Sequence, residues 1–115
     1  MDDNYSVRRF QNSDAKEVSA LIIKTLRTTN IKDYSVDYIE NDVKMFAPDE
    51  VAERASWTHF YVVEDHKIIV GCGAIGSYWG KEDESSLFNI FVLPEYQGKG
   101  IGRAIIETLE KDEFF

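Results

Sequence analysis

Three glycines alternate at positions 98, 100 and 102, between an apolar strand-like segment and an amphipathic helical pattern. Glycine has no Cβ, so such a turn lets the backbone adopt positive φ angles and lets a ligand approach the main chain closely. The helix that follows presents its first N–H groups and the positive end of its dipole to that ligand. The segment therefore predicts a site for phosphate or pyrophosphate, to which Lys99 and Arg103 would add charged contacts. The alternative is a strand-to-helix turn in which glycine serves the geometry alone.

The N-terminal half has the pattern of one strand followed by helices. Residues 5–10 alternate like a strand, and Asp14 with Glu17 has the spacing of a helix capping box. A second, more polar helix is expected over 33–47, and Pro48 suits the first turn of a third. The apolar residues that recur at helical spacing in the first helix are Val18, Leu21, Ile22 and Leu26.

β-branched and aromatic residues become frequent at Trp57, which predicts strands. The expected bounds are 57–64 and 67–77 for a hairpin around Asp65-His66, 78–85 for a polar loop, and 86–93 for a further strand that is nearly all apolar. A last helix would bury Ile101, Ile105 and Leu109. This order predicts an α/β (α+β) fold, with a mixed, mostly antiparallel central sheet and flanking helices.

Size and charge exclude several classes of protein. A chain of 115 residues has the usual size of a single domain, here 1–115. Thirteen Lys and Arg against 21 Asp and Glu give a net charge of −8, a field that repels nucleic-acid phosphates. The apolar stretches are too short for a membrane span, and the acidic start, Met1-Asp2-Asp3, is unlike a secretory signal. The single cysteine fits a reducing compartment, so the sequence predicts a soluble, cytoplasmic protein.

The segment after the last strand resembles the acyl-CoA-binding motif of the GNAT superfamily of N-acetyltransferases. That motif is Gln or Arg, two residues, Gly, one residue, then Gly or Ala, which matches Gln97, Gly100 and Gly102. It commonly follows a strand that ends in Val-x-Pro, here Val92-Leu93-Pro94. The order of elements upstream resembles the N-terminal half of the family, so the resemblance covers nearly the whole chain.

The resemblance implies a GNAT-like acyl-CoA N-acyltransferase fold and an activity. Members transfer the acetyl group of acetyl-CoA directly to an amine, without an acyl-enzyme, so acetyl-CoA is the implied co-substrate and a primary amine the implied acceptor. It also implies that the turn amides hold the CoA pyrophosphate, while the last strand pairs with the pantetheine arm. The implied cofactor-binding residues are Phe91, Val92, Gln97, Gly98, Lys99, Gly100, Ile101, Gly102 and Arg103.

Glu84 is the candidate general base. Many members of the family place a Glu near the start of the fourth strand, where this chain has Ser86. Glu84 lies two residues earlier, roughly 7 Å along a strand, from where it would act through water. The alternative is a solvated loop carboxylate. Three acidic residues of the helix expected over 33–47 would attract a cationic amine or form a solvated face: Asp37, Glu40 and Asp42.

Family members continue with a fifth strand and further elements, whereas this chain ends at Phe115, as the motif helix ends. The resemblance therefore predicts an incomplete domain, truncated after the pyrophosphate motif, whose fourth strand is an open apolar edge. Such an edge tends to pair with another chain, which predicts a homodimer. A non-catalytic CoA-binding or dimerising module is the alternative function, and a generic phosphate-binding α/β domain is a third.

Other motifs favour structural roles. Residues 71–76 match G-x-G-x-x-G, but no helical pattern opens at their end, so they predict a small-residue strand packed closely against helices. Cys72 is expected in the core rather than as a nucleophile. His59 and His66 have no further Cys or His at metal-ligand spacing, so no metal site is predicted, and His59 is expected to be structural.

Overall fold

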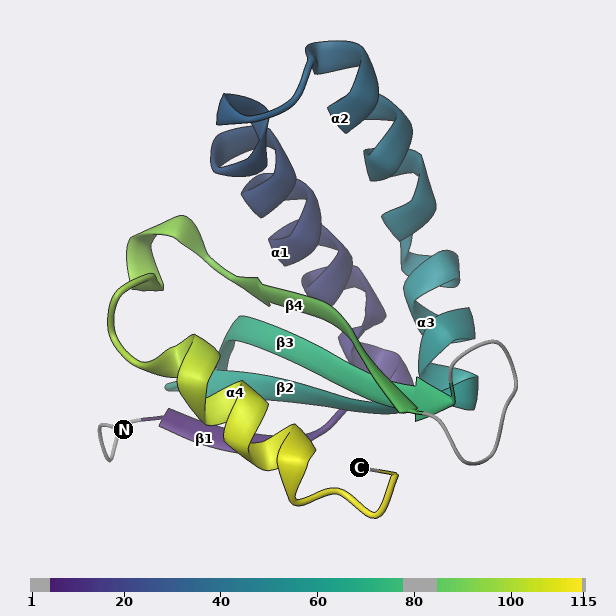
Figure 1. Cartoon of the computed structure of the whole chain (residues 1–115), viewed down its shortest axis with the longest axis vertical. Helices are drawn as coiled ribbons and strands as arrows, with labels where there is room; N and C mark the ends of the chain where they lie inside the picture. Colours follow the sequence, from purple (N-terminus) through teal and green to yellow (C-terminus); the bar gives the residue numbers. More distant parts are fainter. Residues whose placement is uncertain (1–4, 78–84, 115) are drawn as a thin grey trace.

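The computed structural model describes residues 5–77 and 85–114. Four strands form one sheet in the order β1-β2-β3-β4, and the three neighbouring pairs are antiparallel (Figure 1). The strands are β1 (Tyr5–Arg9), β2 (His59–Asp65), β3 (Ile68–Ser77) and β4 (Ser85–Val92). The helices are α1 (Ala15–Thr28), α2 (Val36–Val43), α3 (Pro48–Trp57) and α4 (Ile101–Glu110), and the 3₁₀ turns are η1 (Asn12–Asp14), η2 (Asn30–Lys32), η3 (Lys44–Phe46) and η5 (Pro94–Tyr96).

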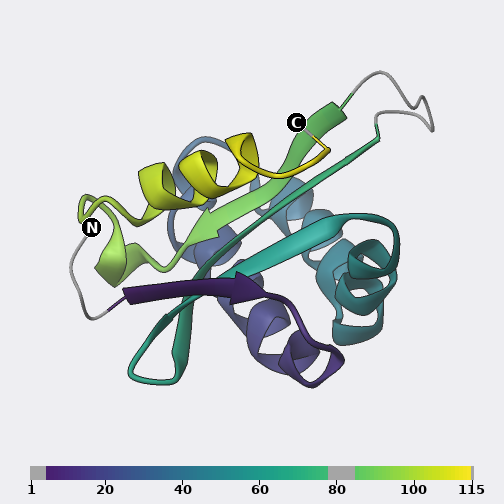
Figure 2. The same ribbon diagram turned by 90° about the horizontal axis from the view of Figure 1, so that it is seen from below.

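Helices cover both faces of this sheet. The helices α1, α2 and α3 lie on one face, and α4 lies across the other, as Figure 2 shows from below. Successive residues of a strand point to opposite faces. In β2, Phe60 and Val62 therefore join the core under α1 to α3, while Val63 joins the core under α4. The prediction of a mostly antiparallel sheet with flanking helices is confirmed.

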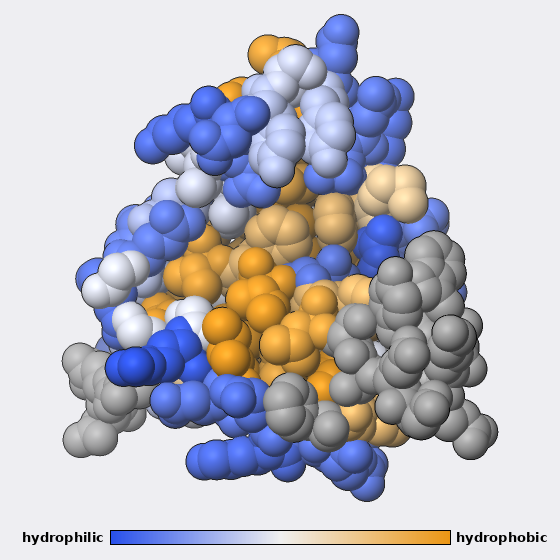
Figure 3. All heavy atoms as spheres, in the orientation of Figure 1, coloured by the Kyte–Doolittle hydropathy of each residue, from blue (hydrophilic) through white to orange (hydrophobic). Residues whose placement is uncertain are grey.

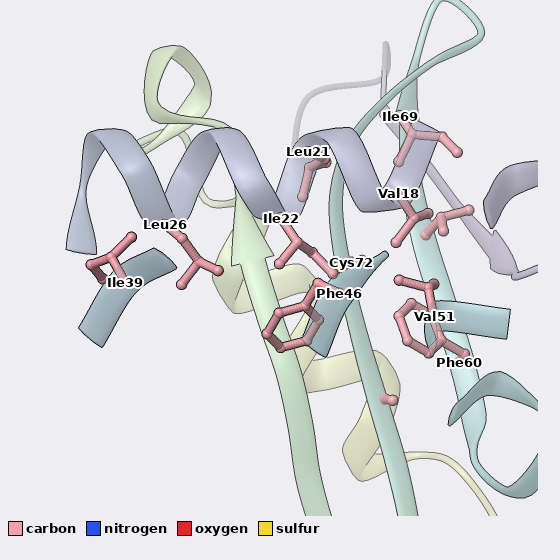
Figure 4. Close-up of a cluster of buried hydrophobic side chains, with 12 residues drawn as sticks. Val18, Leu21, Ile22, Leu26, Ile39, Phe46, Val51, Phe60, Ile69 and Cys72 are labelled. Carbon is pink, nitrogen blue, oxygen red and sulfur yellow. The ribbon is translucent and has the colours of Figure 1, made fainter. Parts of the chain in front are cut away.

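The larger core cluster lies between α1, α2, α3 and the sheet (Figure 4). The α1 residues predicted to form one buried face are at most 3% exposed: Val18, Leu21, Ile22 and Leu26. Their partners come from the other helices and from the sheet: Ile39, Phe46, Val51, Phe60, Val62, Ile69, Cys72 and Ala74. On the opposite face, Ile101, Ile105 and Leu109 are buried against the sheet, which confirms the predicted apolar face of α4.

The start of α1 differs from the predicted capping box. Asp14 makes no side-chain cap with Glu17. Its carboxylate instead accepts hydrogen bonds from the Arg8 guanidinium at 2.8 and 3.0 Å, and from the Gln11 amide at 2.8 Å. The bond from Arg8 holds the pKa of Asp14 below its ordinary value. Glu17 accepts from the Ile69 amide in β3 at 2.8 Å, whereas Asp14 closes a local capping box with Gln11 at the start of η1. The predicted cap between Asp14 and Glu17 is therefore absent.

The helix predicted over 33–47 is shorter in the structure. The Ser35 hydroxyl accepts a hydrogen bond from the Tyr38 amide and caps α2, which therefore begins at Val36. The helix ends at Val43, and the next three residues tighten into the 3₁₀ turn η3.

The other element bounds shift by a few residues. Pro48 begins α3 as predicted, but α3 extends through Trp57, so β2 starts at His59 and not at 57. The turn between β2 and β3 is formed by His66 and Lys67, whose φ angles of 51° and 71° correspond to a type I′ hairpin turn. Lys67, which was expected in the strand, therefore belongs to the turn. The strand predicted over 86–93 begins and ends one residue earlier, because β4 runs from 85 to 92. Residue 85, predicted as the end of the loop over 78–85, therefore belongs to β4.

A bulge interrupts β4 near its middle. One residue of β3, Gly73, separates Cys72 from Ala74, whereas two residues of β4, Asn89 and Ile90, separate the partners of that pair. Asn89 has a φ of 53°, a left-handed conformation that asparagine tolerates better than most residues. Such a bulge bends the strand and redirects its backbone groups.

None of the helices in residues 5–77 and 85–114 is long and apolar enough to cross a membrane. Within the same ranges, no three side chains among His, Cys, Asp and Glu are grouped in a way that would hold a metal ion.

Candidate functional site

The glycine-rich turn after β4 leads directly into α4 (Figure 1). Gly98 and Gly100 have left-handed backbones, with φ angles of 80° and 85°. A Cβ added at either residue would meet nothing within 4 Å. The backbone conformation therefore explains the glycines, and the space beside them is open to a ligand.

The first turn of α4 adds amide donors to this open turn. Ala104 N donates to Gly100 O, which is the first hydrogen bond of the helix. The amides of Ile101, Gly102 and Arg103 precede it and have no acceptor within the helix. The Ile101 side chain is 1% exposed beneath α4, so only its backbone can serve a ligand. These amides and the positive end of the helix dipole together favour an anion such as a phosphate.

The side chain of Gln97 holds the turn against the rest of the protein. Its amide nitrogen donates to Val92 O at 3.1 Å and to Thr29 Oγ1 at 3.3 Å. The Thr25 hydroxyl also lies 3.4 Å from Val92 O. The last turn of α1 is therefore tied both to the end of β4 and to the glycine turn. Gln97 stabilises the turn through its side chain, and its backbone N–H donates to Pro94 O at 3.3 Å. The amides left for a ligand are therefore those that follow Gln97.

The two cations of the motif lie at the surface of the turn. The Lys99 ammonium is 5.4 Å from the centroid of the Tyr96 ring. The Tyr96 hydroxyl donates to Asp65 at 2.9 Å, which raises the pKa of Tyr96 and ties the turn to the β2–β3 hairpin. The Arg103 side chain is 86% exposed and 4.0 Å from Glu107. Both cations are free to move onto an anion at the turn.

The two candidate residues of β4 point their backbones in opposite directions. Leu93 N donates to Val70 O, so the backbone groups of Leu93 and of Phe91, two residues earlier, face β3. Those of Val92 face the other edge of β4, which has no neighbouring strand in the part of the chain that the structure describes. Val92 O already accepts from the Gln97 side chain, so the Val92 N–H is the backbone group of this residue that is left for a ligand.

Apolar side chains cover the surface along β4. In Figure 3 the apolar atoms gather between α2 and α3 on one side and α4 on the other. Leu87 is 38% exposed, and the Phe91 ring packs edge-on against Phe46 with their centroids 5.7 Å apart. This surface suits the uncharged arm of a ligand whose charged end lies at the glycine turn.

Comparison with known proteins agrees with this geometry. The family model described as acetyltransferase (GNAT) domain matches residues 56–114, just over half of the chain. The chain belongs to the GNAT acetyltransferase family. The matched region contains β2, β3, β4, the glycine turn and α4, so it includes the candidate site. Among curated proteins, no relative matches this GNAT chain.

Solved GNAT structures share the fold of this chain. The PaiA N-acetyltransferase from Thermoplasma acidophilum, solved with coenzyme A, matches with a TM-score of 0.80 at 18% identity, over 93% of this chain and 70% of its own. A GCN5-related N-acetyltransferase from Rhodopseudomonas palustris matches with a TM-score of 0.80 at 20% identity, over 96% and 66%. A GNAT family acetyltransferase from Brucella melitensis, solved with acetyl-CoA, matches with a TM-score of 0.70 at 21% identity, over 90% and 64%. The predicted GNAT-like fold is confirmed, and the chain spans about two thirds of the length of these proteins.

The structure describes the acidic residues of α2 in this GNAT chain but not the candidate base. Glu84 lies outside the described residues, so its role stays a prediction. Ser86 pairs with Gly76 near the start of β4. On α2, Glu40 forms an ion pair with Arg27 at 2.8 Å, whereas Asp37 is exposed and Asp42 is half-buried.

His59 is structural, as predicted. Its Nδ1 lies 2.8 Å from Asp112 Oδ1, its ring stacks on Phe114 at 3.7 Å between centroids, and the Tyr61 hydroxyl donates to Asp112 at 2.6 Å. Burial acts to raise the pKa of Asp112, but the hydrogen bonds from Tyr61, the Phe114 amide and His59 outweigh it and lower that pKa. This cluster fixes the segment after α4 against β2.

The segment over 71–76 is part of strand β3, as expected, and does not open a helix. Cys72 is fully buried, and burial raises the pKa of its thiol to about 12. The thiol is therefore protonated at neutral pH and unsuited to act as a nucleophile.

Sequence reasoning missed three residues that shape the site: Thr25, Thr29 and Asn89. Thr25 in the last turn of α1 and Thr29, the residue that caps it, are spaced i, i+4 and therefore share one face, but nothing local shows that this face meets β4 and the glycine turn. Asn89 carried a usable signal, because asparagine is depleted in strands and enriched at left-handed positions. A single Asn in an otherwise apolar strand points to a bulge.

Proposed function

We propose that this chain binds acetyl-CoA and transfers its acetyl group to the nitrogen of a primary amine. The observation that carries the proposal is the turn from Gln97 to Arg103, which combines two left-handed glycines, open space beside them and the unpaired amides of α4. The choice of ligand is supported by the relatives from Thermoplasma acidophilum and Brucella melitensis, solved with coenzyme A and with acetyl-CoA.

Different residues would bind the different chemical parts of CoA. The pyrophosphate of CoA would accept hydrogen bonds from the backbone amides over 98–103, with Lys99 and Arg103 as countercharges. The pantetheine arm would pair with the Val92 N–H, as an added strand does, and would run along the apolar surface near Phe91. Ile101 would contribute its amide, because its side chain belongs to the core.

The transfer itself requires few groups. The neutral amine nitrogen attacks the carbonyl carbon of the thioester, the new N–C bond forms, the C–S bond breaks, and CoA leaves as a thiolate that takes up a proton. A base must first remove the proton of the ammonium, and backbone amides polarise the carbonyl. We propose Glu84 as this base, acting through water, and Asp37 and Asp42 as groups that attract a cationic acceptor.

Isothermal titration with acetyl-CoA tests the binding step. We expect saturable binding close to one ligand per chain. A desulfo analogue of CoA should bind as well, because the site is built on the pyrophosphate. Pantetheine, which has no pyrophosphate, should bind far more weakly. A folded chain that binds none of the CoA compounds would contradict the proposal, and binding of another phosphorylated ligand at the same turn would favour the generic phosphate-binding domain.

A panel of amines tests the transfer step. Release of CoA in proportion to an acetylated amine supports the enzyme, whereas tight binding without turnover of any amine supports the non-catalytic CoA-binding module. Light scattering after size-exclusion chromatography tests the homodimer that the β4 edge predicts, and a monomer at high concentration would contradict it. The cytoplasmic location stays a prediction from the composition.

A further inference from the structure

α4 packs very closely on the middle of β3. A Cβ added at Gly73 would lie 2.4 Å from Ile105 Cγ2, and 3.4 Å from both Ile90 Cγ1 and Leu109 Cδ1. Ile105 is fully buried, and a β-branched side chain on a helix has essentially one χ1 rotamer, so this methyl group cannot swing aside. Any side chain at Gly73 would therefore push α4 and β3 apart.

Gly73 also lies under the bulge of β4. It is the single residue of β3 that stands opposite Asn89 and Ile90. The neighbouring Cys72 thiol donates to Asn89 O at 3.3 Å and holds the bulge from the other face of the sheet. Strand β4 and helix α4 therefore both contact Gly73, although this residue lies outside the glycine turn.

The contact at Gly73 determines where the α4 amides lie. Ile105 is four residues after Ile101, which is about 6 Å along a helix that moves as one rigid body. The Val92 side chain also packs against the α4 core. The backbone at the end of β4, however, is held by hydrogen bonds from outside α4, since Leu93 N donates to Val70 O and Val92 O accepts from Gln97 and Thr25. A displacement at Ile105 would thus move the first amides of α4 relative to the Val92 edge of β4.

We propose that Gly73 is a positioning residue for acetyl-CoA. Its missing side chain seats α4 against β3, and this seating sets the spacing between the amides over 101–103 and the edge of β4. The proposal rests on the proposed function, because those two groups are the ones assigned to the pyrophosphate and to the pantetheine arm. Gly73 touches neither part of the ligand.

The test compares Gly73→Ala with Gly76→Ala in the same strand. An added Cβ at Gly76 would lie 2.9 Å from Thr58 Cγ2, beside the end of α3 and away from α4. Titration of CoA and thermal unfolding are measured for both variants. We expect Gly73→Ala to raise the Kd for CoA by about tenfold or more, because the amides and the strand edge that would hold the two parts of the ligand would no longer be correctly spaced. Gly76→Ala should lower the melting temperature and leave this Kd within about twofold.

A second substitution links the effect to the contact. Ile105→Ala removes the methyl group that the new Cβ would meet, so the double variant Gly73→Ala with Ile105→Ala should recover most of the lost CoA affinity. Two residues in contact are expected to be non-additive in this way. If Gly73→Ala does not fold, the double variant carries the test, and it should match Ile105→Ala in CoA affinity.

The outcomes separate this inference from the proposed function. Wild-type affinity in a folded Gly73→Ala variant, equal losses in Gly73→Ala and Gly76→Ala, or a double variant that folds without recovered affinity would each overturn the positioning role. If the wild-type chain itself binds no CoA, the proposed function fails, and amide hydrogen exchange over 98–104 decides the positioning role. Exchange altered by Gly73→Ala but not by Gly76→Ala supports it, and unaltered exchange overturns it.

Discussion

Gly98 and Gly100 have left-handed backbones and open space beside them, whereas Gly71 and Gly73 lie in strand β3 against α4. A Cβ added at Gly71 or Gly73 would lie 3.0 Å or less from a side-chain atom of α4. In the turn, glycine is needed for a conformation that other residues avoid, and the space beside it stays available to a ligand. In the strand, the same residue is needed because a helix occupies the place of a side chain. One residue type thus creates an open site in one region and a closed contact in the other.

The comparison also shows why a motif alone is a weak guide. Residues 71–76 match the fuller glycine pattern, G-x-G-x-x-G, yet they form the interior of a strand. The shorter pattern of Gln97, Gly100 and Gly102 runs into the first turn of α4, and only there do the glycines lie beside amides without an acceptor in the helix. The element that follows the glycines separates the two cases.

The largest effect expected in the turn comes from Gly100→Val. A β-branched residue cannot hold a φ of 85° without strain of about 1–3 kcal/mol, so the turn should change conformation and misdirect its amides. We expect the affinity for CoA to fall by about 100-fold or more, with the fold retained. Titration of CoA and circular dichroism measure the two quantities.

Gly102→Ala is the matched control. Its added Cβ would meet Val92 Cγ2 at 4.0 Å, an ordinary contact, and its φ is not left-handed. We expect CoA affinity within about threefold of the wild type. Unchanged binding by Gly100→Val would break the assignment of the open turn.

A smaller effect is expected from Gly71→Ala and Gly73→Ala in strand β3. Each should lower the free energy of unfolding, and the closer contact should cause the larger loss. An added Cβ lies 2.4 Å from Ile105 Cγ2 at Gly73, but 3.0 Å from Ile101 Cγ2 at Gly71. Overpacking costs about 1–3 kcal/mol, so Gly73→Ala should lie at the upper end of this range and Gly71→Ala at the lower end. Urea unfolding with a common m-value measures both. The reverse order would show that α4 does not limit the space in β3.

The smallest effect concerns Cys72, between the two strand glycines, and depends on pH. Burial raises the pKa of its thiol from the ordinary 9.0 to about 12. Above pH 9.0 the unfolded chain is stabilised by ionisation of this thiol, while the folded chain keeps the thiol protonated. Its contribution to stability is therefore complete below that pH and is lost as the pH rises towards 12.

The matched variant is Cys72→Ala, which lacks this ionisation. Wild type should lose more free energy of unfolding than Cys72→Ala between pH 7 and pH 10, as urea titrations at both pH values would show. Parallel losses in the two proteins would mean that the thiol is accessible, contrary to a closed strand.

Much of the fold was predictable because it follows from local patterns. The buried faces of α1 and α4 repeat at helical spacing, and the β2–β3 hairpin and β4 follow from β-branched and aromatic runs. The errors fall where a partner from another element competes with a local preference. Asp14 and Glu17 have capping-box spacing, but Arg8 and the Ile69 amide take their carboxylates. Ile69 is far from Glu17 in the sequence and leaves no local trace, whereas Arg8 is close to Asp14 but belongs to the strand before the helix.

The sequence by itself determined the family, the glycine turn and the helix after it, since positive φ angles, free amides and helix dipoles are properties of a short segment. Only the tertiary structure decided that Gln97 bonds to Thr29, that Asn89 forms a bulge and that α4 rests on Gly73. These contacts depend on which surfaces meet when helices pack on a sheet. Close packing makes them specific to tenths of an ångström, whereas hydrophobic periodicity specifies only which face is buried.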